Sequence, residues 1–421
     1  MQFILFLFYL SLFVLVIRTY ELHRHTGFGV RMISGIFLLK VLAGCVNLLV
    51  YNRIYTESDM SFYHWYSLVD LQLLSTSPAA FFKEWLLNWG DLSHHLNIFK
   101  PGNAVYWTDL GRQFHVKFMT LCNILSFGHL YVNVIFFNFF FFLGQLLLYK
   151  AFYKKYREDK WLLLFTVFAI PTVLFWCSSI NKDGWVMAAL GIILYSANGL
   201  KQKRKSALPG LVFGLFFLFI VRYFYFMLIV PVLLFWFIIE YFRLKPLLAY
   251  TIFTALSVIL FFSIGLFFPQ FDPMQIIAHK QAEFLTLQGG SNLYLPVLDH
   301  TIKSYLNAIP HALDHVFFQP HPGIYNKWVI YVAMFGTWAE TLLIIWLFLK
   351  IKKYRLSDPF LWGPVFFVMI IYVVIGLTVP NIGAIVRYKS EFTALLIPAL
   401  VVLSDAKLPA KWERQLESWI K

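Results

Sequence analysis

Stretches of about 20 mostly apolar residues, each long enough to cross a bilayer as a helix, recur along almost the whole sequence. Hydrophobic residues make up 60% of the 421 residues and charged residues only 13%, a charged fraction well below that of soluble domains. A helix satisfies its backbone hydrogen bonds within one segment, as a bilayer requires. The sequence therefore predicts an all-α, polytopic bundle of transmembrane helices, with residues 1–421 as a single integral membrane domain.

The basic residues give the chain a formal net charge of +14, which in a soluble protein would suggest a nucleic-acid partner. Here Lys and Arg gather in short clusters between apolar runs, at 150–160, 201–205, 243–245 and 350–355. This distribution is typical of cytoplasmic loops under the positive-inside rule. We therefore predict no nucleic-acid partner, an N-terminus outside and a C-terminus in the cytoplasm of a bacterial inner membrane.

The clusters and apolar runs together predict about eleven helices, with 10–13 as the range. They are 2–17, 33–51, 131–149, 161–177, 184–200, two short helices within 208–240, 247–268, 328–349, 360–379 and 392–403. Residues 52–115 and 269–325 form two long non-cytoplasmic loops, 380–391 a short external link, and 404–421 a cytoplasmic tail. We expect Arg222 near the outer tip of the two short helices and Lys40 to reach toward the cytoplasm.

The first outer loop holds an acidic motif soon after the second predicted helix. Glu57, Asp59 and His64 are candidate catalytic residues, because a carboxylate can deprotonate an acceptor hydroxyl and histidine can act as acid or base. The two carboxylates would also suit a divalent cation as cofactor. The other interpretation is a pair of solvated loop carboxylates and an interfacial histidine.

The same loop contains a candidate sugar-binding segment, formed by Tyr106, Trp107, Asp109 and Arg112. Aromatic rings pack against sugar faces, while Asp and Arg hydrogen-bond hydroxyls or phosphates. These aromatic residues could equally anchor the loop at the bilayer surface. We predict no metal site at His94-His95, since adjacent histidines point in different directions.

The link 178–183 is short and polar although it joins two apolar helices. Lys182 would bind a lipid diphosphate at the start of the following helix, whose amides also favour an anion. Asp183 is a candidate catalytic carboxylate or, alternatively, the cap of that helix. Arg222 and Arg387 would lie in the same outer layer and complete a phosphate site; interfacial snorkelling is the other interpretation of each.

Three segments carry a resemblance to a known group of proteins: the early acidic motif, the Phe175-Trp176-Cys177-Ser178-Ser179 turn followed by Lys182-Asp183, and Arg387-Tyr388. With 307–320 in the second loop, they resemble bacterial polysaccharide-assembly membrane proteins, namely GT-C-type glycosyltransferases and Wzy-like repeat-unit polymerases. The resemblance implies an outer-loop acidic residue as base or metal ligand, and outer-face arginines that bind substrate. A strict Asp-x-Asp is absent, because Glu57 stands in the first position.

The combined expectation is an enzyme that moves a sugar or growing glycan from a polyprenyl-linked donor at the outer face. The sequence has no Walker or GxGxxG nucleotide-binding motif. An enzyme that uses a polyprenyl-linked donor needs no such motif. A flippase or transporter for a lipid-linked glycan is the alternative, although no internal repeat supports it. A non-catalytic component of a polysaccharide-assembly complex is the third interpretation. Expected partners are the polyprenyl-linked glycan, membrane lipid and, in the third interpretation, such a complex.

Overall fold

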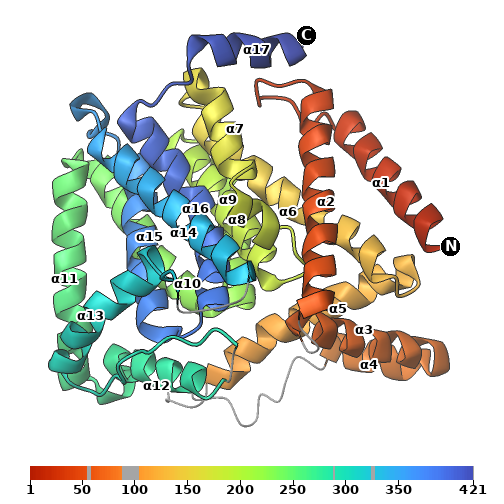
Figure 1. Ribbon diagram of the computed structural model, residues 1–421, viewed down its shortest axis with the longest axis horizontal. Helices are drawn as coiled ribbons and strands as arrows, with labels where there is room; N and C mark the ends of the chain where they lie inside the picture. Colours follow the sequence, from red (N-terminus) through yellow and green to blue (C-terminus); the bar gives the residue numbers. More distant parts are fainter. Residues whose placement is uncertain (55–57, 88–103, 288–289, 324–327, 421) are drawn as a thin grey trace. The chain divides into compact units, whose positions relative to one another are not determined.

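The computed structural model describes residues 1–54, 58–87, 104–287, 290–323 and 328–420, with the backbone alone for 87, 104–109, 271, 419 and 420. In these ranges all regular secondary structure is helical apart from an isolated bridge between Asn292 and Asn381. The predicted all-α class is confirmed. The helices form two compact units, and α10 runs from the first into the second near Phe226 (Figure 1).

The first unit contains α1 to α9, the first part of α10, and α17. These helices are α1 (Gln2–Thr19), α2 (Val30–Ile54), α3 (Asp59–Thr76), α4 (Pro78–Leu87), α5 (Ala104–Ser126), α6 (Leu130–Tyr153), α7 (Lys160–Phe168), α8 (Pro171–Trp176), α9 (Lys182–Lys201), α10 (Leu208–Phe242) and α17 (Ala410–Ile420).

The core of the first unit is the pair α6 and α9, which pack closely and in parallel. A Cβ atom on Gly191 would collide with the carbonyl of Gly144, and one on Gly144 would collide with Ala188. Further along both helices, the Asn198 side chain donates to the carbonyl of Ala151 at 3.1 Å. Small residues allow this close approach between apolar helices. The pair thereby fixes the position of the start of α9.

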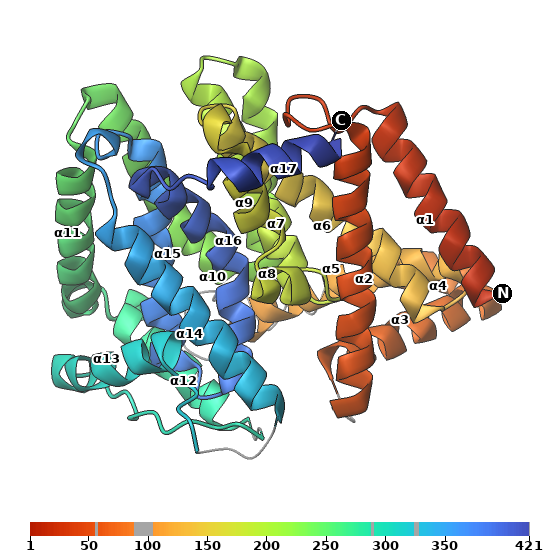
Figure 2. The same ribbon diagram turned by 45° about the horizontal axis from the view of Figure 1, so that its top comes forward.

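The predicted tail 404–421 contains the helix α17, which lies across the start of α7 (Figure 2). Glu417 accepts a hydrogen bond from the Trp161 indole at 3.1 Å and pairs with Lys160 at 2.5 Å. Just before α17, Lys407 pairs with the buried Asp159 at 2.7 Å. The end of the chain is therefore attached to the 157–161 segment by several polar contacts.

The second unit contains the end of α10 and six further helices. These are α11 (Pro246–Phe267), α12 (Pro273–Leu285), α13 (Ile302–Phe317), α14 (Trp328–Leu349), α15 (Pro359–Thr378) and α16 (Ile382–Ser404). Helix α16 is buried along nearly its full length between α14 and α15. The predicted external link 380–391 is therefore wrong: Asn381 caps α16, which already includes Arg387.

The two outer loops predicted from the sequence contain helices. Within the described residues, α3, α4 and part of α5 lie in the first loop, and α12 and α13 in the second. Helix α5 is 23 residues long and continues beyond the predicted first loop to Ser126. Buried Gln281 orders the second loop by donating to the Pro296 carbonyl and accepting from the Leu298 amide.

Seven helices in the described ranges are long and apolar enough to cross a membrane: α1, α2, α6, α10 with the short turn before it, α11, α14 and α15. They show a multi-pass membrane protein. The eleven predicted helices are these seven, with α10 counted as two, together with α9, α16 and one helix that spans α7 and α8. Helices α9 and α16 are not among the seven, and each of them carries three charged residues.

Candidate functional site

A break in the helical chain between α8 and α9 creates a buried polar turn in the first unit. Pro171 occupies the first turn of α8, and Ile170 before it is extended, as the proline ring requires. Helix α8 ends at Trp176, and α9 begins at Lys182 after the extended Asn181. Residues 177–183 are all buried, so their polar groups need partners inside the protein.

Helices α2 and α6 supply those partners. Lys40 donates to the Cys177 carbonyl at 3.2 Å and to the Ser178 hydroxyl at 3.1 Å. Asn138 donates to the Ser178 carbonyl at 2.8 Å, and a Cβ on Gly44 would lie only 2.5 Å from that oxygen. The expectation that Lys40 reaches toward the cytoplasm is wrong, because the side chain is fully buried and holds this turn.

The turn lies at the depth of the middle of two long apolar helices. Lys40 is the eleventh of the 25 residues of α2. On α6, the ring of Phe141 lies against Gly184, eleven residues after Leu130, where α6 begins. At 1.5 Å per residue, that is about 16 Å along the helix. The turn predicted at the outer edge is therefore well inside the helical bundle.

Two charged residues open α9 in this buried environment. The Lys182 side chain reaches 5.9 Å from the centre of the Tyr63 ring, and the residue is 7% exposed. Asp183 has no exposed surface, and its carboxylate lies 3.8 Å from the guanidinium of Arg222. Helix α10 is broken at Arg222, whose φ of −152° and ψ of 81° are not helical. The predicted interruption at Arg222 is confirmed.

Helices α3 and α5 close the site from another side. The Tyr63 ring lies 4.5 Å from the ring of His115, which is completely buried. Gly111, one turn earlier on α5, allows the helix to approach the carbonyl of Val221, the residue before the break. Arg112 follows directly and lies over the ring of Phe62 at 5.8 Å. The crossing of α5 and α10 therefore brings Arg112 to the same region.

Aromatic packing holds the start of α9 in place. The indole of Trp185 is 4.7–6.1 Å from six phenylalanine rings, those of Phe114, Phe118, Phe137, Phe140, Phe141 and Phe217. These rings come from α5, α6 and α10, so one residue of α9 contacts all three neighbouring helices. Such contacts orient Lys182 and Asp183 without adding charge.

We call Arg112, Lys182, Arg222 and Asp183 the cationic cluster. Arg222 pairs with the buried Asp183 carboxylate at 3.8 Å, Lys182 precedes Asp183 in the first turn of α9, and the amides at the N-terminus of this helix add partial positive charge. Guanidinium groups bind phosphate oxygens in a bidentate manner, whereas an ammonium group acts as a point charge. The cluster is therefore suited to bind an anion such as a phosphate or diphosphate.

Asp59 is placed near this cluster by the geometry of α3. Ser58 caps the helix by accepting from the Ser61 amide, and Asp59 stands in the first turn with an exposed side chain. Tyr63 follows four residues later, and residues with this spacing share one face of a helix. Asp59 is thus the solvent-accessible carboxylate one turn away from the ring that contacts Lys182.

Other predicted residues are not brought to the cluster by the described structure. His64 is half-buried on α3, where burial lowers its pKa, and it is rotated about 100° from Tyr63. Arg387 belongs to the second unit, where it is 9% exposed within α16. The remaining predictions fall outside the described residues or side chains: Glu57, His94, His95, Tyr106, Trp107 and Asp109.

Tyr63 and His115 were not among the candidate residues predicted from the sequence. Gly111 stands one helical turn before His115 and is a local sign that α5 packs closely at this point. Among the residues that the structure describes, no group of three His, Cys, Asp or Glu side chains could hold a divalent cation.

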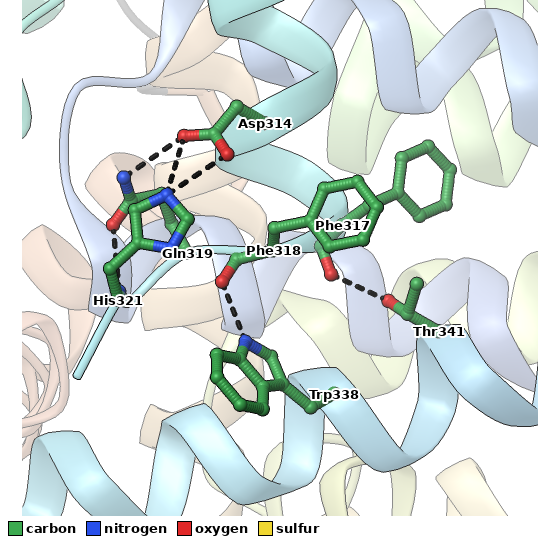
Figure 3. A network of polar contacts seen from close by, with 7 residues as sticks. All are labelled: Asp314, Phe317, Phe318, Gln319, His321, Trp338 and Thr341. Atoms are coloured by element: carbon green, nitrogen blue, oxygen red, sulfur yellow. Dashed lines mark hydrogen bonds and ion pairs between the residues drawn. The ribbon is translucent and has the colours of Figure 1, made fainter.

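The second unit has its own buried polar network, at the end of α13. Lys389 donates to the carbonyl of Val316, Thr341 to that of Phe317 at 2.7 Å, and Trp338 to that of Phe318 at 2.7 Å. These carbonyls lie at the C-terminal end of α13, where a helix supplies no hydrogen-bond donors of its own. Donors from α14 and α16 take that place. Figure 3 shows the contacts of Thr341 and Trp338.

The segment after α13 is folded back by Asp314. Its carboxylate accepts from His321 at 3.0 Å and from the Gln319 side chain at 3.0 Å (Figure 3). The Gln319 side-chain oxygen in turn accepts from the His321 amide at 3.1 Å. These residues have a local structural role, since every contact lies within eight residues of chain.

Compared with protein-family models, curated proteins and solved structures, the chain gives no match. The interpretation of the cationic cluster therefore rests on the residues of this chain and their geometry.

Proposed function

We propose that the protein transfers a sugar or a growing glycan from a polyprenyl phosphate or diphosphate donor at the outer face of a bacterial inner membrane. The observation that carries this proposal is the cationic cluster at the depth of the middle of α2 and α6. A cationic site so far from the helix ends is suited to an anion carried by a lipid. A water-soluble nucleotide sugar would have to reach the same depth without a membrane anchor.

The chemistry follows from where charge changes during the transfer. The bond between the anomeric carbon and the phosphate oxygen breaks, and that oxygen keeps the electron pair. Arg112, Lys182 and Arg222 would stabilise the negative charge that develops there. An acceptor hydroxyl attacks the anomeric carbon and loses its proton, for which Asp59 is the accessible carboxylate.

Asp183 takes a different role in this proposal from the catalytic one first expected. With no exposed surface and with the Arg222 guanidinium at 3.8 Å, it is poorly placed to meet an acceptor. It would instead orient Arg222 and offset part of the cationic charge before the donor binds. Asp183 is therefore a positioning residue.

A lipid-linked glycan flippase is the second candidate, and one specific observation favours it. Transporters often place substrate sites where discontinuous helices end near the middle of the membrane. The α8–α9 turn and the break at Arg222 form such a place. The same cationic cluster would then hold the phosphate during translocation without any bond being broken.

Lipid-linked glycans from a strain that lacks the gene distinguish these proposals. The transferase predicts that the unused donor accumulates in the outer leaflet, and that wild-type protein restores its consumption. Lys182→Ala and Arg222→Gln, at normal protein levels, should restore less than about a tenth of that consumption, because transition-state charge contacts are worth several kcal/mol. Lys303→Ala, which removes an exposed cation of α13, is the matched control.

Accumulation in the inner leaflet would instead establish the flippase. Normal consumption by both cluster variants would overturn the role of the cationic cluster in either process. The leaflet is identified by adding a glycan-modifying reagent to intact cells, where it reaches only the lipid-linked glycans of the outer leaflet.

A further inference from the structure

The second unit has a cavity of about 620 Å³ where α10 ends and where α11 and α15 begin. Its charged lining consists of Arg243, Lys245 and Lys353, with Glu240 as the carboxylate. Leucine side chains form much of the remaining lining. The volume is within the usual range of small-molecule sites. This end of the unit carries the basic residues that the positive-inside rule assigns to the cytoplasm.

The walls of the cavity are fixed by packing and by the helix ends. Arg243 has a φ of 52°, and the Leu244 amide donates to the Ile239 carbonyl at 3.1 Å, which is the Schellman arrangement of a helix end. Behind this turn, Phe235 of α10 stacks on Phe253 of α11 with ring centres 4.4 Å apart. The turn therefore presents Arg243 and Lys245 from a rigid pair of helices.

Lys353 reaches the cavity from a separate, anchored loop. It begins a short 3-10 helix, Lys353–Arg355, before α15. Lys352 donates its amide to the Leu403 carbonyl at 3.0 Å, and Arg355 pairs with Asp405 at 3.3 Å. Both contacts attach this loop to the end of α16. Arg355 is thus occupied by an internal partner, whereas Lys353 lines the cavity.

The electrostatics favour an anionic ligand. Three cations and one carboxylate, that of Glu240, line the cavity. Helix α11 starts at Pro246, so its N-terminal amides add positive potential. The positive-inside rule explains why cations lie on this side of the protein. It does not require them to surround a cavity.

The lining also favours a ligand with an apolar part. Leu244, Leu247 and Leu248 are 42%, 38% and 58% exposed, and they lie on the turn and first residues of a membrane-spanning helix. We infer that this cavity binds the head group of an anionic phospholipid. The phosphate is placed among Arg243, Lys245 and Lys353, and an acyl chain along the exposed leucines. Basic pockets between helix ends are suited to such lipids.

The test uses the full-length protein in a neutral detergent, with native mass spectrometry and phosphatidylglycerol as the probe. The triple variant Arg243→Gln, Lys245→Gln, Lys353→Gln should bind this lipid at least about tenfold more weakly than wild type. The control triple, Lys201→Gln, Lys203→Gln, Lys205→Gln, removes the same charge from exposed residues outside the cavity lining and should bind like wild type.

A second variant keeps all three cations and fills the space instead. Ser357→Trp places a large ring in the cavity lining and should reduce lipid binding to a similar extent. Equal losses in the two charge triples, or full binding by Ser357→Trp, would overturn the site. Displacement of the lipid by inorganic phosphate at equal concentration would overturn the lipid as ligand, because a free anion would then suffice. Equal binding of phosphatidylcholine would also contradict the role of the anionic head group.

Discussion

The guanidinium of Arg222 lies 3.8 Å from the carboxylate of Asp183, and this pair joins the break in α10 to the first turn of α9. Asp183 has no exposed surface, while the Arg222 side chain is 27% exposed. Removing one partner of such a pair leaves the other charge without compensation, which costs more than the pair contributes. The pair therefore controls both the stability of the site and the orientation of Arg222.

Asp183→Asn should lower the free energy of unfolding by about 1–3 kcal/mol, because Arg222 keeps its charge in a mostly buried position. The measurement is unfolding of the detergent-solubilised protein by increasing SDS. Glu21→Gln is the control, since Glu21 pairs with Arg24 at the exposed surface and should contribute less than about 0.5 kcal/mol. Equal effects of the two substitutions would show that Asp183 does not form a significant buried pair.

Lys389 should be among the most sensitive residues of the second unit. It is 2% exposed, donates to the Val316 carbonyl and interacts electrostatically with Glu340. Lys389→Met should destabilise the protein by about 3–5 kcal/mol. The substitution removes the cation that interacts with the buried Glu340 carboxylate and the donor to the Val316 carbonyl. The double variant with Glu340→Gln should lose less than the sum of the single losses. Strict additivity would mean that the two residues are not coupled.

The contact between α6 and α9 gives a prediction about side-chain packing, in which no charged group takes part. Gly191→Ala should lower stability by about 1–3 kcal/mol, because the new methyl group meets the Gly144 carbonyl and the helices must separate. Gly35→Ala is the same substitution on α2, where a Cβ has no atom within 4 Å. It should leave stability unchanged or slightly higher. A similar loss at both positions in the SDS experiment would contradict the close packing.

Several of these elements were predictable because local rules determine them. The helix 328–349 is found with the predicted bounds, since its apolar run contains one charged residue, Glu340, and ends at the basic Lys350. Pro246 begins α11 at the position where a proline costs no hydrogen bond. Arg222 breaks α10 as expected, because a cation in an apolar helix must reach a partner or water.

The rest depends on contacts between residues far apart in the chain. Lys40 bonds to the 177–178 turn, 137 residues away, and no local pattern indicates this partner. Helix α16 was predicted to begin only at residue 392, since Arg387, Lys389 and Glu391 interrupt the apolar pattern before it. Tertiary partners make these charges tolerable inside the unit, as the Lys389–Val316 hydrogen bond shows. Tyr63 and His115 were missed because their meeting requires α3 and α5 to be placed first.

Stability should fall between pH 7.5 and pH 5.5, in part because of His315 on α13. This residue is 3% exposed, and burial lowers its pKa from the ordinary value of 6.5, while neighbouring Asp314 opposes the shift and His311 and His321 add to it. In the unfolded chain His315 takes up a proton near pH 6.5, but in the folded protein only at lower pH. The folded state is therefore favoured above pH 6.5, and this contribution is lost as the pH falls toward the folded pKa.

The substitution His315→Gln removes this proton uptake, so the stability of the variant should depend less on pH than that of wild type. One histidine contributes at most about 1.4 kcal/mol per pH unit to the slope. SDS unfolding at pH 7.5, 6.5 and 5.5 measures it, with the exposed His300→Gln as the control. His64, whose pKa burial also lowers, should act in the same direction, so His64→Gln combined with His315→Gln should flatten the profile further. If His315→Gln and His300→Gln keep the wild-type slope, the acid sensitivity of the protein arises from other groups.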